Sequence, residues 1–209
     1  TVFQEAADWR SHTAQANMQL LADSPIMMHD LYALLALNLE RIDFIDQPVP
    51  LGFDCPLDLH CTYTRDQILI AMDYMTPKNV REGVKWLPDK QVDVFFITLN
   101  KADKDYSPTT MYNDYSINES LFHWQSQSTT NAEGKVGQRY INHRKNGSKV
   151  LLFVREFKND VYGNTAPYTY LGTVNYVSHN GSRPMNITWR LHEPIPAKYL
   201  RKTNKLVVG

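Results

Sequence analysis

The chain has 209 residues, of which 43% are hydrophobic and 21% charged, a globular composition that excludes disordered, collagen-like and small disulfide-stapled proteins. Its 22 basic and 22 acidic side chains cancel, but residues 1–56 carry a net charge of −6 and residues 57–209 one of +6, so the second part attracts polyanions such as nucleic acid. No apolar run approaches the roughly twenty residues that span a bilayer, and the two cysteines, Cys55 and Cys61, favour a cytoplasmic setting. Because the chain begins without a methionine, we expect it to be a piece of a longer polypeptide.

Residues 1–46 are predicted to be helical. Ser24 and Pro25 form a cap with proline in the first turn. The apolar residues that follow at helical spacing are Leu31, Leu34, Leu35, Ile42 and Ile45. Two prolines and a glycine in residues 48–52 cannot continue a helix. We therefore expect an acidic helical lead-in over residues 1–56, which links to a preceding part, and a second domain over residues 57–209.

The second domain is predicted to begin with a short helix and to continue as strands. Residues 64–67 form a capping box, and the apolar face of the helix after it consists of Ile68, Leu69, Met72 and Met75. Strands are expected at residues 92–97, 150–154, 168–177 and 185–191, the last two forming a hairpin around Asn180-Gly181. In the last strand the expected buried face is Met185, Ile187, Trp189 and Leu191. The predicted class is α+β, with a curved, mostly antiparallel sheet or partial β-barrel flanked by helices.

An insert of more than fifty residues between the first two of these strands is rich in aromatic, amide and hydroxyl side chains. A nucleobase needs flat apolar walls and a few donors and acceptors at its edge, and these residue types supply both. On a strand, Phe122, Trp124 and Ser126 would face one way, and the intervening His123 and Gln125 the other. The structural alternative is that the aromatic rings complete a core and that the amides satisfy turns.

The sequence contains only incomplete motifs for a metal site or a catalytic site. Cys55, His60 and Cys61 lack a second ligand pair at zinc spacing, so no metal is expected. His143 and Lys145 match part of the phospholipase D motif, but Val150 stands where that motif needs an aspartate. A metal-dependent nuclease stays open as an alternative, and its residues would be Asp93, Glu156 and Lys158.

Five longer motifs resemble a known family. They are TLNK (98–101), SPTTMYNDY (107–115), FHWQSQ (122–127), GQRY (137–140) and RPMNITWRL (183–191). They look like the C-terminal domain, catalogued as of unknown function, of bacterial modification-dependent type IV restriction enzymes of the SauUSI type. In those proteins the domain follows a phospholipase D-type nuclease and a superfamily II helicase. The resemblance covers most of the second domain, and the helical lead-in is similar to the segment that joins it to the helicase.

The resemblance implies a target-recognition domain of the SRA or PUA-like type that flips a modified cytosine, 5-methylcytosine or 5-hydroxymethylcytosine, out of double-stranded DNA. This chain would bind and not cut, without a metal, cofactor or catalytic residue. The expected base pocket consists of Tyr112, Asp114, Tyr115, His123, Trp124, Gln125, Gln127 and Tyr140. The expected contacts to the DNA backbone are Lys101, Lys104, Thr109, Thr110, Arg139, Arg144 and Arg183. Its other partners would be the helicase and nuclease parts of the same polypeptide; no membrane is expected. A second alternative is a protein-interaction module that docks on the helicase.

Overall fold

The computed structural model describes residues 13–40, 48–100, 114–197 and 199–200. The chain divides into two compact units, Thr1–Ile45 and Asp46–Gly209. The division precedes the predicted end of the lead-in at residue 56. Leu51 explains the difference, because it is buried in the core of the second unit together with Leu57.

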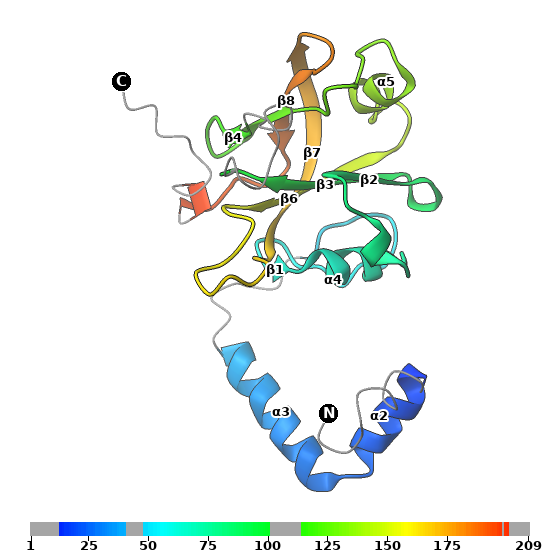
Figure 1. The fold of residues 1–209 in the computed structure, drawn as a ribbon, viewed down its shortest axis with the longest axis vertical. Helices are drawn as coiled ribbons and strands as arrows, with labels where there is room; N and C mark the ends of the chain where they lie inside the picture. The colour runs from blue at the N-terminus through cyan, green and yellow to red at the C-terminus, as the bar shows by residue number, and fades with distance from the viewer. Residues whose placement is uncertain (1–12, 41–47, 101–113, 198, 201–209) are drawn as a thin grey trace. The chain divides into compact units, whose positions relative to one another are not determined.

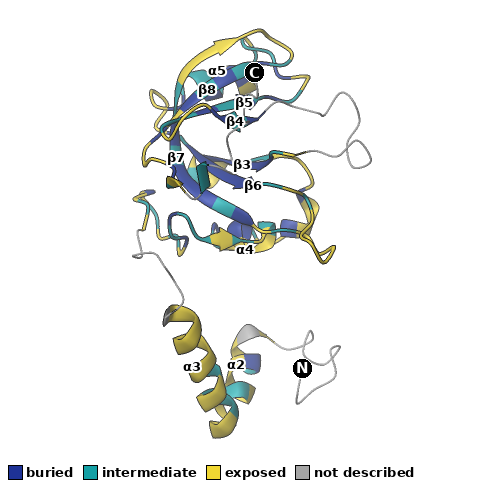
Figure 2. Ribbon diagram, turned by 90° about the vertical axis from the view of Figure 1, so that its left-hand side faces the viewer, coloured by how far each residue is buried: buried dark blue, intermediate teal, exposed yellow. Residues whose placement is uncertain are grey.

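The described residues of the first unit, 13–40, form two helices, α2 (Ala14–Ala22) and α3 (Pro25–Glu40). Ser24 caps α3 as predicted, since its side chain accepts a hydrogen bond from the Met27 amide at 3.4 Å and Pro25 is the first helical residue. The apolar side chains of α3 are largely exposed within this unit, as the yellow helix in Figure 2 shows; Leu34 is 58% exposed. Neither described helix alone has the length and apolar character to cross a bilayer; only the bent pair, taken together, meets that test.

The second unit is built on an eight-stranded sheet (Figure 1). Its strands are β1 (Thr62–Tyr63), β2 (Val84–Leu87), β3 (Val92–Thr98), β4 (Tyr115–Ser116), β5 (Leu121–Gln125), β6 (Lys149–Arg155), β7 (Tyr168–Asn180) and β8 (Asn186–Leu191). The order is β2-β3-β6-β7-β8-β5-β4, and β1 pairs with β7. The described pairs are antiparallel apart from β3 with β6, which run parallel because the long insert carries the chain back across the sheet. The described helices of this unit with defined bounds are α4 (Arg65–Ile70) and α5 (Lys135–Ile141), with short 3₁₀ turns at Pro77–Asn79 and Pro88–Lys90. The chain is therefore α+β with an open, mostly antiparallel sheet, as predicted.

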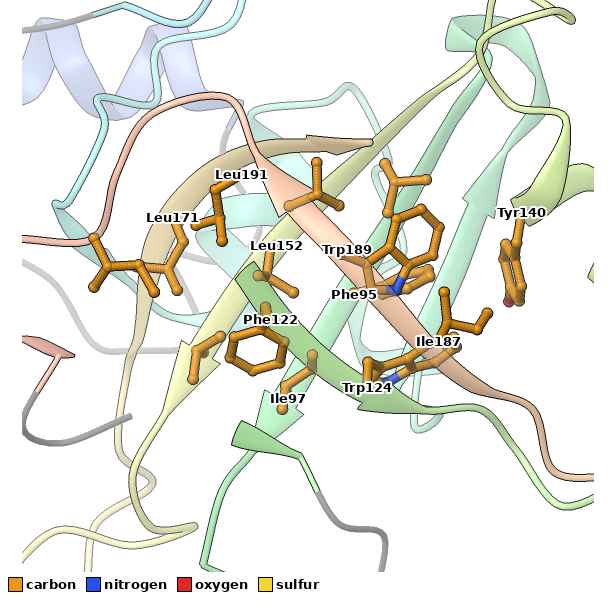
Figure 3. Close-up of a cluster of buried hydrophobic side chains, with 14 of the residues drawn as sticks. Phe95, Ile97, Phe122, Trp124, Tyr140, Leu152, Leu171, Ile187, Trp189 and Leu191 are labelled. Carbon is orange, nitrogen blue, oxygen red and sulfur yellow. The ribbon is translucent and has the colours of Figure 1, made fainter. Parts of the chain in front are cut away.

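The sheet curls around one core. Three strands separate β3 from β5 in the sheet order, yet the rings of Phe95 and Trp124 on these strands are 4.2 Å apart. Figure 3 shows these two rings gathered with Trp189 and with Tyr140, which α5 supplies. Strands that are distant in the sheet order can meet in this way only if the sheet bends strongly, so its two free edges, β2 and β4, come to lie on the same side of the core.

A second core covers the outer face of β3, β6 and β7. Helix α4 packs Ile68 and Leu69 against this face, and Met72 follows them. The capping box is confirmed, because the Thr64 side chain and the Gln67 side chain each accept from the other residue's backbone amide. The expected place of Met75 on this face is wrong: the helix ends at Ile70, and Met75 is exposed.

The predicted hairpin and its alternation are confirmed. β7 and β8 pair antiparallel, and the buried residues of this last segment are Met185, Ile187, Trp189 and Leu191. On β5 the expected face is buried as well, with Phe122, Trp124 and the following Ser126. A period of two therefore located the inner face of the sheet correctly.

Candidate functional site

A cavity of about 310 Å³ lies where the two edges of the curled sheet approach each other. It is lined by Arg65, Arg81, Glu82, Gly83, Val84, Phe96, Ile97, Thr98, Asp114, Trp124, Gln125, Gln127, Arg155 and Tyr168. These residues come from α4, from β2 and the turn before it, and from β3, β5, β6 and β7. We call this hollow the edge cavity. It combines aromatic rings, amides and cations, which is the chemistry of a site for a flat polar ligand.

The end of β5 is fixed in place at this cavity. The Asp114 carboxylate, which is buried, accepts a hydrogen bond from the Gln125 amide at 2.9 Å. The Ser126 hydroxyl accepts from the Met185 amide at 2.8 Å, and the Gln127 carbonyl accepts from the Thr130 amide at 2.9 Å. This backbone network holds the segment that carries both glutamine side chains of the edge cavity.

Two arginines of the edge cavity have no carboxylate partner among the described residues. Arg65 donates to the Val80 carbonyl at 3.0 Å and to the Tyr168 hydroxyl at 3.2 Å, and its guanidinium carbon lies 4.7 Å from the centre of the Phe96 ring. Within the described part of the chain, Arg65 forms no ion pair. Its neutral partners leave its positive charge available to an anion.

Arg155 is held in the same manner. It donates to the Thr98 hydroxyl at 3.0 Å and to the Ala166 carbonyl at 3.1 Å, and it stacks on Tyr168 at 4.4 Å. No carboxylate of the described residues pairs with it either. Sequence reasoning missed both arginines, because each lies at the end of an element whose pattern signals only secondary structure: Arg65 starts a capped helix and Arg155 ends a core strand.

The structure brings four of the predicted pocket residues to the edge cavity: Asp114, Trp124, Gln125 and Gln127. Trp124 is 5% exposed and packs on Phe95, so it is mainly a core residue that reaches the cavity wall.

The other described residues of the predicted pocket do not line the edge cavity. Tyr115 and His123 stack on each other at 4.8 Å between β4 and β5, and neither lines the edge cavity. Tyr140 is 1% exposed and packs edge-on against Phe95, so its predicted place in a base pocket is wrong. Helix α5 delivers Tyr140 to the inner core, where its burial raises the pKa of the phenol. Tyr112 lies outside the described residues.

The predicted backbone contacts are scattered. Arg139 is paired with the buried Asp93, so its charge is already compensated. Arg144 lines a larger hollow of about 790 Å³, which the sheet's β6 and β7 share with the segment around Val49 and which holds none of the predicted pocket residues that the structure describes. Arg183 is exposed in the turn between β7 and β8. The other four, Lys101, Lys104, Thr109 and Thr110, lie outside the described residues.

The residues of the nuclease alternative do not form one site. Asp93 is opposite Val150 in the parallel pair, whereas Glu156 follows the end of β6, six residues further along. At about 3.3 Å per residue, the two carboxylates are roughly 20 Å apart along the strands. Among the described residues, no group of three His, Cys, Asp or Glu side chains is close enough to hold a metal ion. The side-chain oxygens of Asp93 bind Arg139 instead.

A comparison with family models matches residues 57–202 to the family described as Domain of unknown function (DUF3427). The chain belongs to this family. The matched range contains every residue that lines the edge cavity, so this cavity is a feature of the DUF3427 domain itself. None of the curated proteins matches the chain.

Proposed function

We propose that this DUF3427 domain binds DNA and holds one extruded, modified cytosine in the edge cavity, as the SRA/PUA-like target-recognition part of a SauUSI-type restriction enzyme. The observation that carries the proposal is the convergence of Asp114, Gln125 and Gln127 on a cavity that also has aromatic walls. The cytoplasmic location expected from the two cysteines and the absence of catalysis by this chain stay predictions.

The cavity chemistry suits a pyrimidine better than an extended ligand. Its volume of about 310 Å³ is at the lower end of the roughly 300–1,000 Å³ that small-ligand sites occupy. The Trp124 and Phe96 rings offer apolar surface, and a glutamine amide such as that of Gln127 offers both a donor and an acceptor to the edge of the base. Carboxylate acceptors recognise the exocyclic amino group of cytosine, which is the role we assign to Asp114.

The arginines of the edge cavity fit the phosphates that flank an extruded base. Arg65, Arg81 and Arg155 outnumber the two acidic side chains, Glu82 and Asp114, in its lining. A guanidinium matches the geometry of a phosphate oxygen pair and keeps its charge at all accessible pH values. The anionic backbone would therefore be attracted to the rim while the base enters the cavity.

The base pocket and the phosphate contacts contribute different amounts to the binding free energy. A well-packed methyl group contributes roughly 1–3 kcal/mol, a factor of about 10 to 200 in preference, whereas extruding a paired base costs a few kcal/mol. Phosphate contacts must therefore supply most of the affinity, which makes binding steeply dependent on salt.

The test is a titration of the chain with duplexes that differ only in the modification of one cytosine. We expect a preference for the modified duplex, and we expect Gln127→Ala to reduce that preference severalfold. Gln15→Ala, on the exposed face of α2, is the matched control and should keep the parent ratio. Equal affinity of the parent chain for all duplexes would refute the proposal. Trp124→Ala is unsuitable, because its loss of packing against Phe95 would disturb the core.

A further inference from the structure

A third hollow, of about 550 Å³, lies between α5 and the neighbouring edge of the sheet. It is lined by Trp86, Gln91, Lys135, Gln138, Arg139, Asn142, Lys145, Asn146 and Ser148. Among the residues that the structure describes, the lining therefore has three cations, four amides and no carboxylate. We call it the α5 hollow. Its chemistry differs from that of the edge cavity, because amides and lysines dominate and a single aromatic ring is present.

One face of α5 builds this hollow. Lys135, Gln138, Arg139 and Asn142 are spaced i, i+3, i+4 and i+7, which places their side chains on one side of a helix. The side-chain amides are oriented: Gln138 Nε2 donates to the Ala132 carbonyl at 2.9 Å, and Gln138 Oε1 accepts from the Asn142 side-chain Nδ2 at 2.9 Å. The polar groups of the hollow are therefore preorganised before any ligand arrives.

The charge of the α5 hollow comes from its lysines. Arg139 is paired with Asp93, and its guanidinium carbon lies 4.4 Å from the centre of the Trp86 ring. These contacts hold its side chain in place at the side of the hollow. Lys135 and Lys145 are exposed, and neither pairs with a carboxylate among the residues that the structure describes. These two ammonium groups thus face a hollow to which the described part of the chain contributes no acidic side chain, and this favours an anion.

The α5 hollow and the edge cavity share strand β2. Val84 lines the edge cavity and Trp86 lines the α5 hollow. Two residues along a strand are about 7 Å apart and project from the same face. Each DNA strand carries one phosphate per roughly 3.4 Å of helix axis, so a strand that runs along β2 would present phosphates to both sites.

We propose that the α5 hollow binds the phosphodiester backbone of the DNA strand whose base enters the edge cavity, through Lys135, Lys145 and the amides. The inference rests on the proposed function and extends it, because it assigns a second contact to a different set of residues. Such contacts position the strand and carry no information about the base. The hollow should therefore raise affinity equally for modified and plain duplexes.

The test replaces both lysines, as Lys135→Gln with Lys145→Gln, and measures affinity over a range of salt concentrations. The slope of log affinity against log salt should fall by roughly one unit for each lysine, with a loss of about five- to tenfold per lysine near 0.1 M salt. The ratio of affinities for modified and plain duplex should not change. Arg190→Gln, an exposed cation on the outer face of β8 that lines neither site, is the matched control and should keep the slope.

The outcomes separate the two proposals. An unchanged slope in the double variant, or an equal loss in Arg190→Gln, overturns the α5 hollow as a binding site. A parent chain that shows no preference for modified DNA, but loses its slope in the double variant, overturns the proposed function and leaves the hollow as a general contact to DNA. A change in the preference of the double variant also contradicts the inference, because it would place the lysines at the base.

Discussion

Arg139 donates two hydrogen bonds to Asp93, from Nε at 2.7 Å and from Nη2 at 2.8 Å, across 46 positions of sequence. The Asp93 side chain is 1% exposed. Burial raises the pKa of the Asp93 carboxyl and the hydrogen bonds from Arg139 oppose that rise, while Asp93 raises the pKa of Arg139 despite the burial of the guanidinium. The pair fastens α5 to strand β3, which positions the lining of the α5 hollow.

We predict that Arg139→Ala lowers the free energy of unfolding by about 3–5 kcal/mol, because it leaves the Asp93 carboxylate buried without its partner. Urea unfolding followed by circular dichroism measures this loss. Replacing both residues, with Asp93→Leu and Arg139→Met, should cost less than the single change, since no unpaired buried charge remains. If Arg139→Ala is as stable as the parent, the pair has no structural role.

His143 gives the domain a dependence on pH. Its ring is buried, and Nε2 accepts a hydrogen bond from the Tyr176 amide at 3.0 Å, so the proton of the neutral ring must be on Nδ1, 3.3 Å from the Ser148 carbonyl. Burial lowers the pKa of His143 below its ordinary value of 6.5, with the Ser148 contact opposing it. The unfolded chain therefore takes up a proton as the pH falls through 6.5 while the folded chain resists.

The contribution of His143 to the free energy of unfolding should be fully present above pH 6.5. Below pH 6.5 it should decrease by at most about 1.4 kcal/mol per pH unit. Urea midpoints measured between pH 7.5 and pH 5.5 should show this decline, and His143→Gln should flatten it. A variant with the same decline as the parent would assign the dependence to other groups.

Gly137 lies where α5 meets the preceding loop. A Cβ atom there would be 2.2 Å from the Asn131 carbonyl oxygen and 2.9 Å from the Ala132 Cα, both backbone atoms. In a free helix Gly→Ala stabilises by about 1 kcal/mol, but here we predict that Gly137→Ala destabilises by roughly 1–3 kcal/mol or more, because the backbone must move. Thermal unfolding of the variant measures the sign. Gly147→Ala, at a positive φ with open space around it, is the comparison that separates steric conflict from backbone strain.

We expect the capping box of α4 to contribute modestly to the free energy of unfolding. The Thr64 hydroxyl accepts from the Gln67 amide at 3.2 Å, and the Gln67 side chain accepts from the Thr64 amide at 2.8 Å. Thr64→Ala should lower the free energy of unfolding by about 1 kcal/mol, and Thr64→Ser by less, since serine keeps the cap. If both variants are as stable as the parent, tertiary contacts alone stabilise α4.

Local patterns in the sequence predicted several elements correctly, since their causes are local, but they did not predict β2 or α5. Ser24-Pro25 starts a helix, the capping box starts another, and the alternation in β8 separates buried Trp189 from exposed Arg190. Each of these signals depends on residues within four positions of one another. Met75 was misplaced because the turn after Ile70 ends the helix before the apolar spacing does.

The amino-acid sequence by itself determined the α+β class and the inner face of the sheet, whereas the structure brought Asp114, Trp124, Gln125 and Gln127 to the edge cavity. Only the tertiary structure decided that Tyr140 fills the core, that Arg139 pairs with Asp93, and that Arg65 and Arg155 join that cavity. The physical reason is that these partners belong to different elements and meet only when the sheet curls, and no local spacing encodes which distant strands that curl brings together.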